Sequence, residues 1–176
     1  GNILNITGNE GFRLLSIPTT STTFADLLDP LWTQGIGTGA DVTNGDANVF
    51  TWDEVNDVWS DASNLNTEPD AGTGFLAFVF EDDDFVAGGI QGGFPKTLSL
   101  SGSENSGPVS PTPINQNPDG FTLLGNPFAS TISLDNLTAT DITNVAYVWD
   151  PNDGSGTEDQ NNTTTNGSWI ASDGNI

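Results

Sequence analysis

The sequence has no cysteine, no histidine and no methionine, and its only basic side chains are Arg13 and Lys96. Without cysteine the chain forms no disulfide and offers no thiolate metal ligand. Without histidine the common zinc sites and the Ser-His and Cys-His catalytic pairs are excluded. A chain with almost no lysine and abundant Asn, Thr, Gly and Asp is typical of secreted and cell-surface proteins, so we expect an extracellular location.

Acidic side chains carry nearly all of the charge. Asp and Glu number 24 against 2 Lys and Arg, which gives a net charge of -22 at pH 7. Such a chain repels the phosphate backbone of nucleic acids and the anionic surface of membranes. It also has no apolar run long enough to span a bilayer. We therefore expect no nucleic-acid partner and no membrane insertion, whereas cations and salt should relieve the self-repulsion of the chain.

Catalytic motifs are missing as well. The sequence contains no Gly-x-Ser-x-Gly, no P-loop and no dinucleotide fingerprint. Paired carboxylates can hydrolyse glycosides, but in a chain with 24 acids any one pair is uninformative. We predict that the chain is not an enzyme. Because it begins at Gly1 rather than at methionine, we expect a mature or excised product.

The main feature that is present is an internal duplication. The segment Gly-Phe-Arg-Leu-Leu-Ser-Ile-Pro at residues 11–18 returns as Gly-Phe-Thr-Leu-Leu-Gly-Asn-Pro at residues 120–127. A second shared block follows each copy, at residues 48–53 and 144–150, and a tryptophan then closes each unit, Trp59 and Trp169. We predict a first repeat over residues 1–100, a linker rich in Ser, Pro and Asn over 101–119, and a second repeat over 120–176. We expect these parts to form one compact unit.

Short apolar segments separated by turn residues predict many β-strands and little helix. Strands are expected at residues 12–17, 49–52, 58–59 and 96–100, and residues 74–80 should form a central strand that is buried on both faces. One helical turn is expected at 24–28, with Thr23 as its cap. Residues 145–149 and 169–170 should form a hairpin around a long polar insertion. The predicted fold class is all-β, an antiparallel β-sandwich of the jelly-roll kind built from two homologous halves.

The second repeat lacks one predicted strand. The first repeat continues after Trp59 into the apolar segment 74–80, whereas the second reaches residues 174–176 after Trp169 and stops. A sandwich without this strand would have an open edge and an apolar groove. Three explanations remain open: the chain is a cut product, residues 2–7 fill the place, or a neighbouring molecule donates a strand.

Candidate cation ligands lie in the acidic run that follows residues 74–80. Asp82 and Asp84, at alternate positions, are our candidate metal ligands, and the hard cation Ca²⁺ is the ion that suits them. The plainer alternative is a solvated strand end. The loop from Asp150 to Asp159 fails the spacing of a calcium loop, and the group around Asp41 is weaker still. No cofactor is therefore certain, and Ca²⁺ is the candidate.

The five tryptophans could stack on sugars or anchor the core. Four of them recur at equivalent places in the two repeats, so we expect them to be duplicated core anchors. Trp32 has no counterpart in the second repeat. It is therefore the candidate ligand-binding or interface residue.

Several motifs together resemble a known family. In order along the chain they are residues 11–18, 23–28, 32–35, 74–84, 93–96 and 124–128. Their order resembles a β-rich domain of large secreted and cell-surface proteins of Bacteroidota, often found just before a sorting domain for type IX secretion. The resemblance covers nearly the whole chain, implies a structural, adhesive or assembly role, and brings no catalytic residues.

These observations favour a non-catalytic extracellular structural or assembly module of a bacterial surface protein or filament. Its expected partners are further copies of itself or neighbouring domains, and strand complementation is a candidate way of joining them. The alternative is a carbohydrate-binding module attached to a secreted hydrolase, with a polysaccharide as its ligand.

Overall fold

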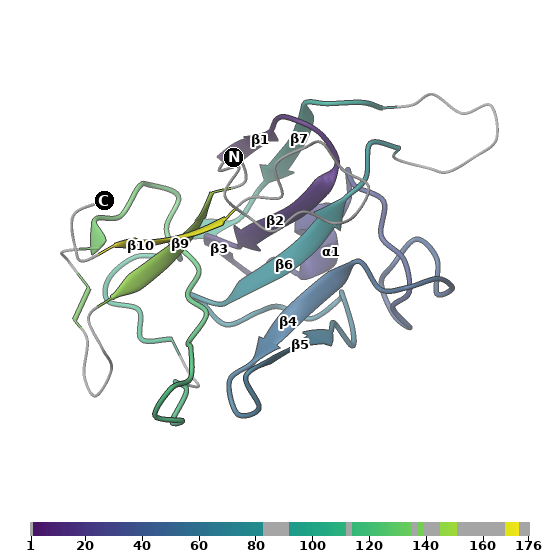
Figure 1. The fold of residues 1–176 in the computed structure, drawn as a ribbon. Coiled ribbons are helices and arrows are strands. Elements are labelled where there is room, and N and C mark those ends of the chain that lie inside the picture. Colours follow the sequence, from purple (N-terminus) through teal and green to yellow (C-terminus); the bar gives the residue numbers. More distant parts are fainter. Residues whose placement is uncertain are drawn as a thin grey trace. The chain divides into compact units, whose positions relative to one another are not determined.

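The structure is a computed structural model and describes residues 2–82, 92–111, 114–134, 137–138, 145–150 and 168–172. It divides into two compact units, Gly1–Ser130 and Thr131–Ile176. The described part contains ten strands and one short helix, as Figure 1 shows. The first unit holds β1 (Asn2–Ile6), β2 (Gly11–Ser16), β3 (Thr19–Thr20), α1 (Phe24–Leu28), β4 (Val49–Asp53), β5 (Val58–Asp61), β6 (Gly74–Val79), β7 (Lys96–Leu100) and β8 (Ser103–Glu104). The second holds β9 (Ala146–Asp150) and β10 (Ser168–Ser172).

The fold class predicted from the sequence, all-β with antiparallel sheets and very little helix, is confirmed. The principal sheet has four strands in the order β2-β6-β4-β5, and each neighbouring pair is antiparallel. β6 lies between β2 and β4, as its continuous run of apolar residues requires. Burial on both faces was expected, but only one face of β6 is fully buried, through Phe75, Ala77 and Val79.

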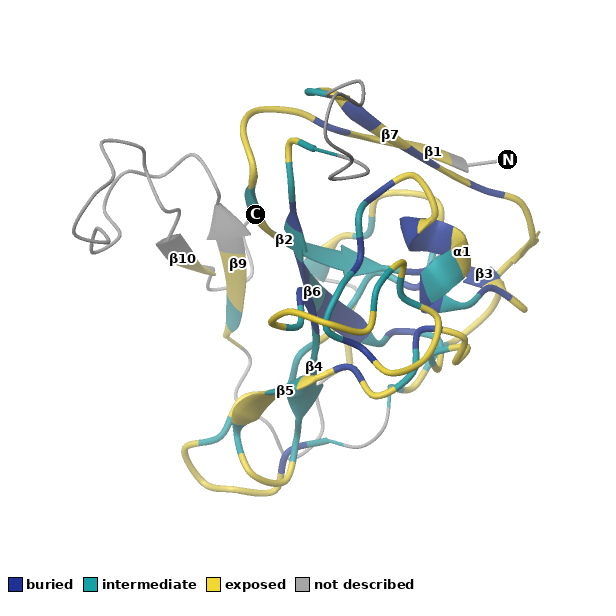
Figure 2. Cartoon of the chain, turned by 90° about the vertical axis from the view of Figure 1, so that its right-hand side faces the viewer, coloured by how far each residue is buried: buried dark blue, intermediate teal, exposed yellow. Residues whose placement is uncertain are grey.

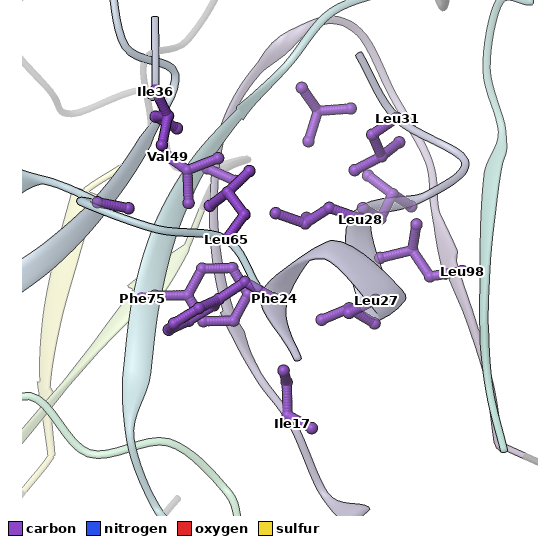
Figure 3. Packing of buried hydrophobic residues seen from close by; sticks show 14 of the residues in the cluster. Ile17, Phe24, Leu27, Leu28, Leu31, Ile36, Val49, Leu65, Phe75 and Leu98 are labelled. Atoms are coloured by element: carbon purple, nitrogen blue, oxygen red, sulfur yellow. The ribbon is translucent and has the colours of Figure 1, made fainter. Parts of the chain in front are cut away.

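The buried face of this sheet packs against α1. Thr23 caps the helix: its hydroxyl accepts from the amide of Asp26, and the Asp26 carboxylate accepts from the amide of Thr23. The helix buries Phe24, Leu27 and Leu28, and the ring of Phe24 meets that of Phe75 edge to face at 4.9 Å. Figure 3 shows these side chains gathered with Ile17, Leu65 and Leu98 into one core.

Two smaller ladders complete the first unit. β1 pairs with β7 over the whole length of both strands, from Asn2 opposite Leu100 to Ile6 opposite Lys96. β3 pairs with β8, which lies inside the predicted linker. Residues 2–6 pair with β7, and among the described residues they pair with neither β9 nor β10. That the N-terminal segment fills the missing place in the second repeat stays a prediction.

The second unit contains the hairpin β10-β9. Trp149 lies opposite Trp169 in its register, just as Trp52 lies opposite Trp59 in the β4–β5 hairpin. The two hairpins therefore match, but two equivalent halves are not confirmed by the described residues. Residues 11–16 form the strand β2, whereas of the matching residues 120–125 only Leu124 forms a β-bridge, to Thr73.

Candidate functional site

The principal sheet has a second apolar face, opposite the core. Residues paired across antiparallel strands point to the same face, so the register assigns its members. Phe12 lies opposite Phe78, Phe50 opposite Leu76, and Trp52 opposite Trp59. We call this surface the aromatic face; it consists of Phe12, Leu14, Phe50, Trp52, Trp59, Leu76 and Phe78.

The rings of the aromatic face pack on one another at steep angles. Phe12 meets Phe78 at 5.1 Å with the ring planes 85° apart, and Trp52 meets Trp59 at 5.2 Å and 70°. Phe12 is 44% exposed and Trp59 is 36% exposed, while the other members are half-buried. Figure 2 shows this contrast along the sheet: dark blue residues concentrate on β6, and β5 is largely yellow.

The prediction that the repeated tryptophans anchor the core is wrong for the first hairpin. The core cluster includes neither Trp52 nor Trp59, because both face away from α1. The side chains of Trp149 and Trp169 lie outside the described residues, so for them the prediction stays a prediction.

A polar clamp ties the β4–β5 hairpin to the start of the second repeated motif. The indole N–H of Trp52 donates to the carbonyl oxygen of Phe121 at 2.8 Å. In the turn of the hairpin, Asp57 adopts a left-handed backbone with φ of 54°, and its carboxylate accepts from the side-chain amides of Asn115 and Asn117 and from the amide of Phe121. The predicted linker therefore returns to the first repeat and is fixed there.

Three acids of this hairpin differ in their electrostatics. The pKa of Asp57 is lowered, chiefly by a hydrogen bond from the Asn117 side chain. The pKa of Asp53 is lowered in the same way, chiefly by a hydrogen bond from the Asn56 side chain. Burial raises the pKa of Glu54; hydrogen bonds from Leu123 and Thr122 oppose this rise, and the negative charges of Asp57 and Asp53 add to it. One carboxylate oxygen of Glu54, Oε2, is buried without a hydrogen-bond partner.

A small pocket lies beside Glu54. It is lined by Thr51, Trp52, Glu54, Gly72, Thr73, Gly74, Pro111 and Leu123, and its volume is about 70 Å³. Ligand pockets usually measure about 300 to 1,000 Å³, so this one is too small for a sugar ring. The hairpin acids therefore attach residues 115–123 to the β4–β5 hairpin, and we call this attachment the joint.

The Gly-Asn-Pro block of the second repeat is fixed on the first unit at three points. The amide of Gly125 donates to the carbonyl of Gly72 at 2.8 Å, and Ser16 donates through its hydroxyl to the carbonyl of Asn126 at 2.9 Å. Asn105 donates to the carbonyl of Pro127 at 2.9 Å. The Cβ of a larger residue at 125 would lie 2.5 Å from Ser16 Cβ, so glycine permits this close approach.

Trp32, the candidate ligand residue, lies in the loop after α1 and is half-buried. Its indole N–H donates to the side-chain oxygen of Gln34 at 3.0 Å. Its carbonyl accepts from Asn48, a buried residue that also donates to Phe78 and accepts from the amide of Gln34. These contacts hold the loop against β6, a role for Asn48 that sequence reasoning missed. Binding of a ligand by Trp32 stays a prediction.

A buried cation, Lys96 of β7, lies beside the start of the acidic run, a contact that sequence reasoning missed. Lys96 is only 4% exposed, and its ammonium group donates to the carbonyl of Glu81 at 2.6 Å. Its nitrogen also lies 5.4 Å from the centre of the Phe94 ring. Asp82 is half-buried, and Asp84 lies outside the described residues, so the predicted Ca²⁺ pair stays a prediction.

Within the described residues, no group of three or more Asp or Glu side chains is placed to hold a metal ion. Asp41, a weaker candidate in the sequence, accepts from the amide and hydroxyl of Thr33 at 2.7 and 2.8 Å. Its carboxylate thus closes a loop.

The hairpin β9–β10 is exposed on both faces. Tyr147 and Val148, neighbours that point to opposite faces, are 48% and 43% exposed. Ile170, which lies opposite Val148 on β10, is 44% exposed. In the part of the chain that the structure describes, neither strand pairs with a third strand.

No helix among the described residues has the length and apolar character needed to cross a bilayer. Comparisons of the chain with protein-family models, curated proteins and solved structures find no match.

Proposed function

We propose that this chain is a non-catalytic extracellular module that joins its neighbours, in a bacterial surface protein or filament, through strand complementation. The observation that carries the proposal is the β9–β10 hairpin, with Tyr147 and Val148 exposed on its two faces. A two-stranded hairpin alone is at best marginally stable in water. A strand added from a neighbouring molecule would bury these side chains and satisfy backbone groups at the edge of the hairpin.

The charge of the chain sets the conditions for such assembly. At -22, two copies repel each other strongly at low ionic strength. Salt shortens the range of this repulsion to about 8 Å at physiological ionic strength. Association through an apolar strand should therefore strengthen with salt, the opposite of what a contact between unlike charges would show.

The test is the assembly state of the chain and of two matched variants. Sedimentation velocity over a range of protein and NaCl concentrations should reveal association of the native chain that increases with salt, and electron microscopy should show whether the polymers are ordered. Tyr147→Glu should suppress association. Val55→Glu is the control, because Val55 is 73% exposed in the turn of the other hairpin. A native chain that stays monomeric and stably folded at high concentration contradicts the proposal.

Carbohydrate binding is a second candidate, favoured by the exposure of Phe12 and Trp59 on the aromatic face. It ranks second because sugars stack on flat aromatic surfaces, and the rings here meet at 70° and 85°. Titration of the chain with a neutral polysaccharide, followed by tryptophan fluorescence, separates the two candidates. Quenching that Trp59→Ala removes, while Trp32→Ala retains it, would favour sugar binding on the aromatic face.

A further inference from the structure

We propose that the strand which completes the second unit binds to β9, not to β10, and has the sequence pattern of β6, Gly-Phe-Leu-Ala-Phe-Val. In the inferred complex the donated strand runs antiparallel to β9. Its positions matching Phe75, Leu76 and Ala77 lie opposite Val148, Tyr147 and Ala146. This inference rests on the proposed function, because it names the partner and the register of the same hairpin.

The two hairpins match in the register of their tryptophans. Trp52 lies opposite Trp59, and Trp149 lies opposite Trp169. Aligning the hairpins on these pairs places Val49, Phe50 and Thr51 of β4 at the positions of three β9 residues. Those residues are Ala146, Tyr147 and Val148.

β4 has a strand on each edge, whereas β9 has one neighbour among the described strands. β4 pairs with β5 on one edge and with β6 on the other, where Val49 lies opposite Ala77, Phe50 opposite Leu76 and Thr51 opposite Phe75. β9 pairs with β10, and no other strand among the described residues lies beside it. Transferring the β4–β6 register to β9 gives the register proposed above, and it selects β9 because β10 corresponds to the edge strand β5.

Burial supports the same assignment. Val49 of β4 is fully buried, and Phe50 and Thr51 are half-buried beside β6. At the matching positions of β9, Tyr147 and Val148 are both exposed. A strand with large apolar residues opposite Tyr147 and Val148 would cover both faces. It would also carry no charge, so the acidity of this chain would not oppose it.

Within one molecule, none of the described strands with the β6 pattern is available as the donor. β6 itself is paired on both edges, with β2 and β4, and β1 has a different sequence pattern, Asn-Ile-Leu-Asn-Ile. We therefore assign the donor to a neighbouring molecule that presents an extended segment of the β6 pattern.

The test uses the whole chain and a synthetic peptide with the sequence of residues 72–80, which carries no charged side chain. Because the chain has no cysteine, Tyr147→Cys introduces a single thiol. Three peptides carry one cysteine each, as Phe75→Cys, Leu76→Cys or Ala77→Cys. Cross-strand neighbours on one face lie close enough for a disulfide, whereas residues on the opposite face do not, so the Leu76→Cys peptide should give about tenfold more linked product than the other two.

The control variant is Ile170→Cys, on β10, where the side chain is about as exposed as Tyr147. It should link poorly to all three peptides. Hydrogen exchange of the unmodified chain provides a second measurement: the native peptide should protect the amides of β9, and the same peptide with Ala77→Pro should not. Equal linking by the three peptides, or equal linking through position 170, or no protection of β9, would overturn the inference.

Failure here and failure of the proposed function can be told apart. If the native chain associates with salt but the peptide neither links nor protects β9, the inferred donor is wrong and assembly by another contact stands. If the native chain stays monomeric while the peptide binds β9 in the predicted register, the inference stands and assembly between copies is wrong.

Discussion

The indole N–H of Trp52 donates to the carbonyl oxygen of Phe121 over 2.8 Å, and this bond fastens the first hairpin to the second copy of the repeated motif. On the same hairpin, Asp57 and Glu54 accept from the amides of Phe121 and Leu123. The start of the second repeat is thereby held on the first unit by side chains of one turn and one strand. The first three predictions concern this joint and the Gly-Asn-Pro block beside it.

Replacing Trp52 by phenylalanine should weaken the joint while an aromatic ring stays opposite Trp59. The carbonyl of Phe121 loses a donor, and a lost hydrogen bond of this kind lowers the free energy of unfolding by about 1 kcal/mol. Urea unfolding measures the loss, and hydrogen exchange should be faster at residues 115–123. Trp59→Phe is the control and should leave exchange in that segment unchanged. Equal effects of the two variants would show that ring packing, not the bond, holds the joint.

Replacing Gly125 by alanine should destabilise the first unit through a steric clash. The added Cβ would lie 2.5 Å from Ser16 Cβ and 2.7 Å from the carbonyl oxygen of Thr73. Relieving such overpacking typically costs about 1–3 kcal/mol. Gly37→Ala is the matched control, because nothing lies within 4 Å of its added Cβ. If urea unfolding finds the two variants equally stable, the docking of the Gly-Asn-Pro block is wrong.

Replacing Glu54 by glutamine should stabilise the fold at neutral pH, and the gain should shrink as the pH falls. The pKa of Glu54 is raised in the folded state, chiefly by burial, so its ionised form is less favourable folded than unfolded. Its contribution to stability therefore decreases as pH rises from its ordinary pKa through its raised pKa. The gain at pH 7 should be at most about 1 kcal/mol, because solvent screens a partly exposed group.

The pKa shifts of Asp57 and Asp53 are opposite in sign to the shift of Glu54. Their pKa values are lowered in the folded state, so their stabilising contribution is present above the ordinary aspartate pKa and is lost as pH falls through the lowered values. Unfolding curves of the native chain and of Glu54→Gln from pH 7 down to pH 3 separate the two effects. A gain for Glu54→Gln that is as large at pH 3.5 as at pH 7 would show that the charge of Glu54 is not its cause.

Local patterns predicted much of the fold. The spacing of apolar residues and the local composition predicted β2, the β4–β5 hairpin, β6 and β7. Thr23 and the apolar residues that follow it predicted α1 and its cap. These features depend on residues close together in the sequence, and local physical rules therefore suffice for them.

The features that were missed depend on contacts between distant residues. The pairing of β1 with β7 joins segments more than ninety residues apart, as the register of Asn2 with Leu100 shows. The exposed side of Trp59 escapes sequence reasoning, because recurrence of an aromatic residue in both repeats predicts burial although a sheet has two faces. Asn48, Asn115 and Lys96 are buried polar residues whose partners no local pattern reveals.

Lys96 leads to the last prediction, which also tests the candidate Ca²⁺ ligands Asp82 and Asp84. Its buried ammonium group donates to the carbonyl of Glu81, at the start of the acidic run. Lys96→Met should lower the free energy of unfolding by about 2 kcal/mol, because a hydrogen bond from a charged donor is lost. It should also make the fold more responsive to Ca²⁺, since the acidic run then lacks the ammonium group beside it.

Urea unfolding of Lys96→Met with CaCl₂, and with NaCl at the same ionic strength, measures this response. Arg13→Met is the matched control: it removes the same charge from a side chain that donates to the carbonyls of Phe12 and Asn9, rather than to a carbonyl of the acidic run. We expect Ca²⁺ to restore stability to Lys96→Met more than to Arg13→Met, and Asp82→Asn to remove the difference. If CaCl₂ and NaCl act alike on Lys96→Met, the acidic run responds to ionic strength alone, and Lys96 stabilises the end of β6 only through its bond to Glu81.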